Sequence, residues 1–87
     1  MKDLINDNYD SIVARGLITE STSLDDFINK AYEELNELVL ESSGCAGFNE
    51  ELADCILVLL NLAKHFDIDI ESELKNKIQI NYKRVNI

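Results

Sequence analysis

The segment from residue 23 to 41 has apolar side chains at helical spacing and is the strongest constraint on the fold. Ser23 is a favourable N-cap, and Asp25 and Asp26 complement the positive end of the helix dipole. The apolar residues recur three or four positions apart and so share one helix face. They are Leu24, Phe27, Ile28, Ala31, Leu35, Leu38 and Val39. The sequence predicts a helix that begins at Ser23 and ends before Ser42.

Three other segments have the same periodicity. Gly16 is a suitable C-terminal stop for the first, Asn49 is an N-cap for the second, and the third opens at Asp69. Proline is absent and glycine occurs three times, which favours helices joined by short loops. The additional predicted helices cover residues 2–14, 50–65 and 69–84.

A chain of 87 residues is long enough for one domain and too short for two. We therefore expect a single all-α domain, residues 1–87, with a protomer resembling a four-helix bundle. The connections after the second and third helices are short, so the last three helices are expected to be antiparallel neighbours.

The helix predicted for residues 50–65 is apolar on most of its circumference. Leu57 and Leu60 project away from the stripe that would meet the neighbouring helices. Leaving them exposed would forgo about 1.5–3 kcal/mol per side chain. We expect a homo-oligomer, a dimer or a tetramer, with these two residues in the interface. The first helix is an alternative cover for the same surface. Val58 lies beside the acidic residues of its helix and is a candidate pocket wall.

The net charge of −9 argues against autonomous nucleic-acid binding, which needs a surplus of Lys and Arg. Two cysteines and one histidine are too few for a disulfide framework or a closed zinc site. The N-terminal residues do not resemble a signal peptide, and the longest apolar run, residues 55–60, is too short to span a membrane. We expect a cytoplasmic protein without a membrane partner.

Two pairs of carboxylates are the candidate metal-binding groups. Glu34 and Glu37 lie one turn apart beside the apolar stripe of the second helix, and Glu33 falls opposite that stripe. Glu51 and Asp54 are spaced in the same way on the third helix. Either pair alone is usually a solvated surface. Across a short turn, however, the pairs can face each other and would need a counter-ion. Oxygen ligands alone suit Mg²⁺ or Mn²⁺ rather than zinc.

Cationic and amide side chains supply candidate phosphate and substrate contacts. Lys77, Asn81 and Arg84 share one face of the last helix, where cations can bind phosphate or simply complement the helix dipole. Asn61 lies about 10 Å along its helix from Asp54, within reach of a sugar or base, although a structural amide is an equal alternative. His65 is too far from Asp54, about 16 Å, to share a metal with it.

These segments together resemble the MazG-like all-α nucleoside triphosphate pyrophosphohydrolases. That family combines EExxE with ExxD and a Lys/Asn/Arg cluster on the last helix. The matching segments are Lys30–Leu38, Glu51–Asp54 and Lys77–Arg84, and Arg15–Ile18 is similar to the connector of many members. The residues after Asp54 depart from the aromatic-His element of the phosphoribosyl-ATP pyrophosphatases, which argues against that substrate.

The resemblance implies the reaction and the roles of individual residues. The expected reaction is Mg²⁺-dependent hydrolysis of a nucleoside triphosphate, with Mn²⁺ as a possible substitute, to a monophosphate and pyrophosphate. The alternative is a non-catalytic helical interaction or regulatory protein with the same fold. The expected metal ligands are Glu34, Glu37, Glu51 and Asp54, with Glu34 or Glu37 also the catalytic base. The resemblance implies phosphate contacts from Lys77, Asn81 and Arg84, and the other candidate substrate contacts are Asn61 and Lys30.

Overall fold

Four α-helices form the secondary structure of the residues that the computed structural model describes, 1–41 and 46–85. These residues contain no strand, so the prediction of an all-α fold is confirmed. Within the same ranges, no helix combines the length and the apolar composition needed to cross a membrane. The helices are α1 (Lys2–Ala14), α2 (Leu24–Val39), α3 (Ala46–His65) and α4 (Ile70–Val85).

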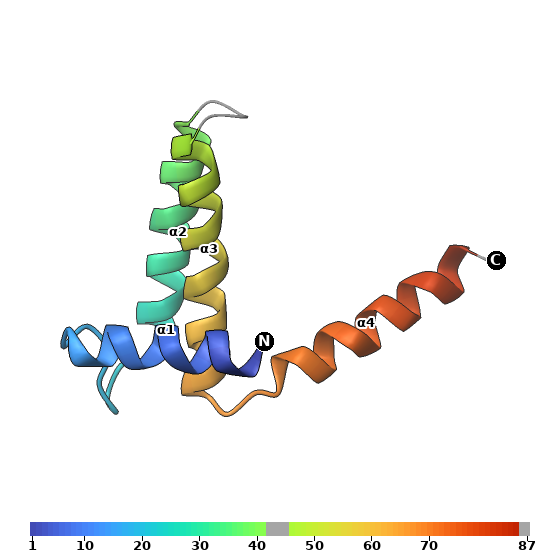
Figure 1. Ribbon diagram of the computed structural model, residues 1–87, viewed down its shortest axis with the longest axis horizontal. Helices are drawn as coiled ribbons and strands as arrows, with labels where there is room; N and C mark the ends of the chain where they lie inside the picture. The colour runs from blue at the N-terminus through green and yellow to red at the C-terminus, as the bar shows by residue number, and fades with distance from the viewer. Residues whose placement is uncertain (42–45, 86–87) are drawn as a thin grey trace.

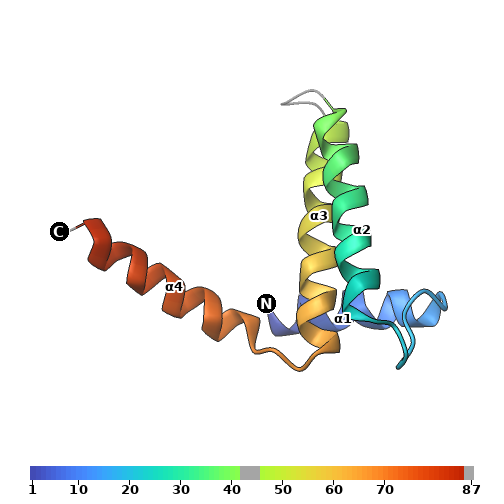
Figure 2. The same ribbon diagram turned by 180° about the vertical axis from the view of Figure 1, so that it is seen from behind.

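Helices α2 and α3 form an antiparallel hairpin, which is the main packing unit of the chain (Figure 1). Helix α1 lies across the end of this hairpin where α3 finishes, and its packing is mainly against α3 (Figure 2). The expected pairing of the second and third helices is therefore confirmed.

Local hydrogen bonds set the helix ends. The Ser23 hydroxyl accepts from the Asp26 amide at 3.2 Å, and the Asp26 carboxylate accepts from the Ser23 amide at 2.9 Å, which completes a capping box. Gly16 has a positive φ of 75°, a conformation that glycine adopts without strain after a helix. Asp69 accepts from the Ser72 amide at 3.2 Å. The predicted roles of Ser23 and Gly16 are confirmed, and α4 begins at Ile70, one residue after the predicted start at Asp69.

The predicted start of the third helix was wrong, because α3 includes Asn49 and extends back to Ala46. Half-buried Gly47 and Phe48 belong to this additional turn. A Cβ on Gly47 would lie 2.6 Å from Oε2 at the end of the flexible Glu41 side chain, which would have to move to make room. The preceding residues, 42–45, lie outside the described ranges.

Phe27 and His65 join the three packed helices into one small core. Phe27 is 4% exposed, and its ring centroid lies 4.9 Å from that of His65. His65 Nε2 lies 2.9 Å from the Thr22 carbonyl oxygen, which can only accept, so Nε2 donates. The other ring nitrogen, Nδ1, lies 2.9 Å from the Tyr9 hydroxyl oxygen. His65 therefore fastens α1 and the connector before α2 to the end of α3.

Helix α1 covers the surface that was expected to be an oligomer interface. Leu60 is 6% exposed, and half-buried Leu57 lines a cavity together with residues of α1. The alternative expectation, that the first helix covers this surface, therefore holds for Leu60, whereas the interface role of Leu57 stays a prediction. Val58 lines the same cavity, as expected.

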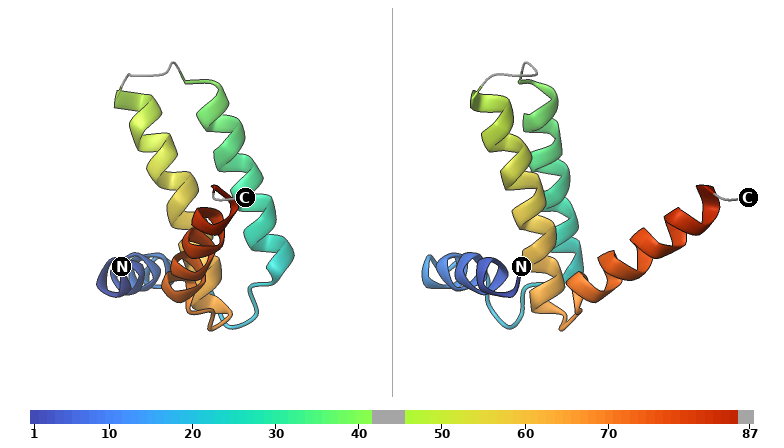
Figure 3. Two further views of the ribbon diagram at one scale, coloured as in Figure 1. Left: turned by 90° about the vertical axis from the view of Figure 1, so that its right-hand side faces the viewer. Right: turned by 45° about the vertical axis from the view of Figure 1, so that its right-hand side comes forward.

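The expectation of a four-helix bundle within one protomer was also wrong. Helix α4 extends away from the hairpin, and only its first turn lies near the start of α1 (Figure 3). Asp67 adopts a positive φ of 55°, and the Ile68 amide donates to the Ala63 carbonyl at 2.9 Å. This turn ends α3 and directs the chain outward, so α4 does not fold back along α2 and α3.

Candidate metal centre

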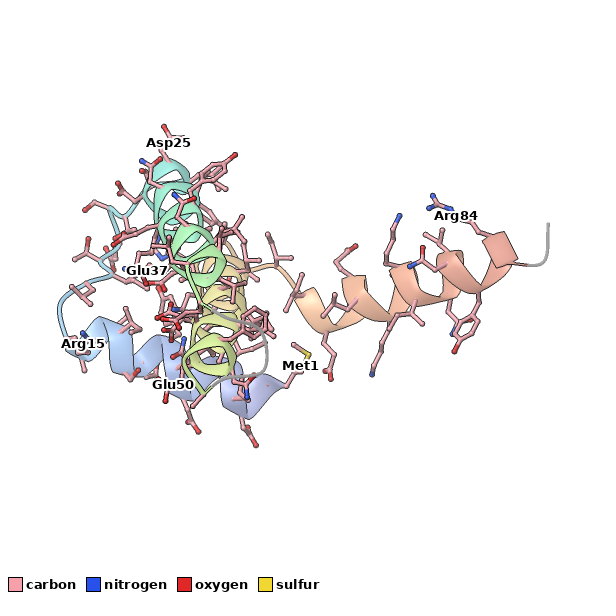
Figure 4. All side chains as sticks on the ribbon, turned by 90° about the horizontal axis from the view of Figure 1, so that it is seen from above. Met1, Arg15, Asp25, Glu37, Glu50 and Arg84 are labelled. Atoms are coloured by element: carbon pink, nitrogen blue, oxygen red, sulfur yellow. The ribbon has the colours of Figure 1, made fainter. Side chains whose placement is uncertain are left out.

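Three carboxylates converge between α2 and α3. Glu34 and Glu37 come from adjacent turns of α2, and Glu51 faces them from the early part of α3. One oxygen of each lies within 4.8 Å of one oxygen of both others. Figure 4 shows Glu37 on the side of the hairpin that faces away from α4. The antiparallel hairpin thus brings together three of the four carboxylates that the sequence singled out.

Two oxygens of this cluster are buried and have no hydrogen-bond partner among residues 1–41 and 46–85. They are Oε2 of Glu34 and Oε2 of Glu51, one from each helix. A buried carboxylate oxygen without a donor or a cation is costly. Because all the available ligand atoms are oxygens, the residues fit a hard divalent cation such as Mg²⁺.

Lys30 partly offsets the negative charge of the cluster. Its Nζ lies 3.1 Å from Oε1 of Glu34 and 3.5 Å from Oε2 of exposed Glu33. The hydrogen bond with Glu34 raises the pKa of Lys30, which keeps its ammonium group protonated. Glu33 is not a member of the cluster, as the helical spacing predicted.

Asp54 lies one turn beyond Glu51 but remains outside the cluster of three. Its side chain is exposed and lines the adjoining cavity. The negative charge of Asp54 still contributes to the raised pKa of Glu51. A cation on the three clustered carboxylates would therefore find Asp54 at the edge of the site.

The raised pKa of Glu51 predicts that the metal-free protein loses folding stability as the pH rises. Burial raises its pKa above the ordinary 4.5, and the charges of Glu37, Asp54 and Glu34 add to this shift. The folded state then holds the proton more tightly than the unfolded state. The favourable contribution of the protonated Glu51 carboxyl to the free energy of unfolding is complete below pH 4.5. It is lost as the pH rises through the folded-state pKa.

Glu51→Gln should therefore melt at a higher temperature than the wild type near neutral pH when no metal is present. This difference should shrink toward zero below pH 4.5, where Glu51 is protonated in both states. Thermal melts in a chelating buffer across this range measure it. Glu50→Gln is the control, because Glu50 is exposed and outside the cluster. If the difference in melting temperature between Glu51→Gln and the wild type did not change with pH, the raised pKa of Glu51 could not be its cause.

A cavity of about 530 Å³ adjoins the cluster, between the hairpin, α1 and the connector before α2. Asn61, 6% exposed, lines it and accepts a hydrogen bond of 2.8 Å from Asn8 of α1. Both apolar and polar side chains line this space. The charged and amide ones are Asn8, Arg15, Lys30, Glu34, Asp54 and Asn61.

Asn8 and Arg15 were not among the sequence candidates. Asn8 lies three residues after Ile5 and four before Ile12, so the helical spacing places an amide on the inward face of α1. A polar residue at such a position needs a partner, and this was the available signal. Arg15 immediately follows α1, and no spacing rule relates it to residues on α2 or α3 (Figure 4).

Lys77, Asn81 and Arg84 do not approach this cavity within the protomer. All three are exposed on α4, and Figure 4 shows Arg84 far from Glu37. Their expected phosphate contacts are therefore not formed by residues of one chain. His65 also lies outside the cluster, and its ring nitrogens bond to Tyr9 and Thr22.

Comparisons with protein-family models, with curated proteins and with solved structures gave no match to this chain.

Proposed function

We propose that this protein is a Mg²⁺-dependent nucleotide pyrophosphohydrolase that converts a nucleoside triphosphate into its monophosphate and pyrophosphate. The observation that carries the proposal is the pair of buried oxygens of Glu34 and Glu51, without a hydrogen-bond partner among the described residues, within the cluster that includes Glu37. Glu34 also lines a cavity that presents cationic and amide groups. The resemblance of the EExxE and ExxD segments to the MazG-like enzymes supplies the reaction.

The carboxylates hold the cation in this proposal. Glu34, Glu37 and Glu51 provide the closest oxygens, and Asp54 provides a further oxygen from the cavity wall. Bound Mg²⁺ would offset phosphate charge and make the attacking water more acidic. Mn²⁺ prefers the same oxygen ligands and is the expected substitute.

The protein's own groups orient the substrate and accept the proton. The oxygen of a water molecule bonds to the α-phosphorus, the anhydride bond between the α- and β-phosphates breaks, and pyrophosphate leaves. An oxygen of Glu37 or Glu34 that does not hold the cation accepts the proton of the water. Lys30 and Arg15, both at the cavity, are the proposed phosphate contacts in place of the cations on α4. Asn61 is the proposed sugar or base contact.

A panel of nucleoside triphosphates assayed for pyrophosphate release with Mg²⁺ tests this function. At least one nucleotide is expected to release pyrophosphate in a reaction that a chelator stops. The alternative, a non-catalytic interaction protein, is favoured by the exposed apolar side chains of α2 and α4. Absence of pyrophosphate release from every nucleotide with Mg²⁺ and with Mn²⁺ would refute the enzymatic proposal.

Mg²⁺ should also stabilise the folded chain, because the cation binds the native cluster and not the unfolded chain. At a hundredfold excess over the dissociation constant the gain is about 2.7 kcal/mol. For a domain of this size such a gain raises the melting temperature by on the order of 10 °C. Thermal melts with and without Mg²⁺ measure this rise in melting temperature. The Glu37→Gln variant should lose most of the rise. An unchanged melting temperature at millimolar Mg²⁺ would contradict the metal site.

A further inference from the structure

Lys30 belongs to both parts of the candidate site. Its Nζ lies 3.1 Å from Oε1 of Glu34, one of the three clustered carboxylates, and its side chain lines the cavity of about 530 Å³ beside α1. Within residues 1–41 and 46–85, it is the only Lys or Arg that forms an ion pair with a carboxylate of this cluster. Its single ammonium group can serve the cluster or an anion in the cavity.

The two partners of this ion pair differ in their freedom to move. The Lys30 side chain is 51% exposed, whereas the Glu34 side chain is 10% exposed. Lys30 lies four residues before Glu34, and this order is the less favourable one for an ion pair on a helix. A half-exposed pair that includes a flexible lysine contributes little to stability. The carboxylate is thus fixed in the hairpin, and the ammonium group is the partner that can leave.

Glu34 has a second oxygen that Lys30 does not satisfy. Oε1 faces Lys30, while Oε2 is buried and has no hydrogen-bond partner among the described residues. Oε2 of Glu51 is in the same condition. A divalent cation held by these oxygens would offset the negative charge of Glu34 and repel the ammonium group of Lys30. Both effects weaken the ion pair between Lys30 and Glu34.

The charges around the cavity give the released ammonium group a role. Lys30 and Arg15 are the two cationic side chains that line it, and Asp26, Glu34 and Asp54 are the three carboxylates. Negative charge therefore predominates there in the metal-free chain, which disfavours phosphate groups. A divalent cation at the cluster reverses this balance, and a Lys30 that no longer contacts Glu34 can bind phosphate oxygens.

We propose that Lys30 is an exchangeable counter-ion, which takes the place of the divalent cation at Glu34 in the metal-free protein and moves to phosphate groups in the cavity once that cation is bound. This inference rests on the proposed function and adds a coupling between its two sites. Cation binding at the cluster strengthens phosphate binding in the cavity, and by linkage phosphate strengthens cation binding equally.

Titration calorimetry with Mg²⁺ alone tests the first half of the exchange on the full chain. Lys30→Met keeps an unbranched stem and removes the charge. Mg²⁺ then has no ammonium group to displace and should bind about tenfold more tightly than to the wild type. Lys64→Met is the matched control and should bind Mg²⁺ as the wild type does. Lys64 is exposed in the last turn of α3, about 20 Å along that helix from Glu51.

Nuclear magnetic resonance of the lysine side chains tests whether Lys30 leaves Glu34. The Lys30 signal is assigned by its absence from Lys30→Met. On addition of Mg²⁺ to the wild type, this signal should shift toward the position that it has in metal-free Glu34→Gln, where the ion pair is already lost. The Lys64 signal should not move. A Lys30 signal that does not respond to bound Mg²⁺ would overturn the proposal.

Inorganic pyrophosphate is the probe for the second half of the exchange. At saturating Mg²⁺ it should bind the wild type about tenfold more tightly than Lys30→Met, because the variant lacks the ammonium group that moves to phosphate. The substitution should therefore have opposite effects on the affinities for Mg²⁺ alone and for pyrophosphate. A lysine that only supports Glu34 would instead weaken Mg²⁺ binding when removed, and a lysine fixed at Glu34 would leave pyrophosphate binding unchanged.

Either of those two results, or a wild type that binds neither Mg²⁺ nor Mn²⁺, would overturn the exchange. None of these measurements depends on turnover, so their failure is distinct from failure of the proposed reaction. A chain with the expected opposite effects that releases no pyrophosphate from any nucleotide would support the exchange and refute only the hydrolysis.

Discussion

Glu37→Gln is expected to lower kcat/KM for nucleotide hydrolysis by about a thousandfold while the helices remain folded. The change keeps the shape of an exposed side chain and removes one charge from the cluster with Glu34 and Glu51. Either proposed role of Glu37, cation ligand or proton acceptor, is lost. Pyrophosphate release measured over a range of Mg²⁺ concentrations checks the result, since a pure ligand defect is partly recovered by excess cation.

Glu33→Gln is the matched control for this experiment. Glu33 lies on the same helix but is exposed, outside the cluster, and 3.5 Å from Lys30. It should retain nearly wild-type activity. Asp54→Asn should have a smaller effect than Glu37→Gln, because Asp54 is not one of the three converging carboxylates. Full activity of Glu37→Gln, or equal losses in Glu33→Gln and Glu37→Gln, would contradict the proposed site.

Features that depend on local sequence were predicted well. Ser23 and Gly16 set helix ends through local structure, and both were recognised from residue type and spacing. Asn49 was misleading because the backbone of α3 continues through it to Ala46. A good N-cap residue is not excluded from a helix interior, where its cost relative to other residues is a fraction of a kcal/mol.

The direction of α4 could not be read from the chain. A short connection shows that two helices begin close together, but not whether the second turns back along the first. The deciding feature is the left-handed conformation of Asp67, with φ of 55°, and the bond from Ile68 to Ala63. Neither has a distinctive sequence signal, since aspartate occupies this conformation only occasionally.

The candidate site was predictable where it depends on two neighbouring helices. The spacing of Glu34 and Glu37, and the short turn that brings Glu51 opposite them, follow from helical geometry. The contribution of α1 was not predictable in the same way. Asn8 meets Asn61 at a sequence separation of 53 residues, so their contact depends on how α1 crosses the hairpin.

Phe27→Ala is expected to lower the free energy of unfolding by about 3–5 kcal/mol, which is a large part of the stability of a small domain. Phe27 is 4% exposed, and its ring centroid lies 4.9 Å from His65 and 6.0 Å from Phe66. Truncation would leave a cavity beside His65, whose bonds to Tyr9 and Thr22 hold α1 and the connector in place.

Urea denaturation followed by circular dichroism measures this loss. Leu4→Ala is the control, because Leu4 is 56% exposed on α1 and should change stability by about 0.5 kcal/mol or less. Both variants should be compared at equal protein concentration, since any self-association would contribute to apparent stability. A Phe27→Ala protein as stable as Leu4→Ala would show that the Phe27–His65 contact does not hold α1 against the hairpin. The cavity beside the carboxylates would then lack its proposed support, because Phe27 and α1 both line it.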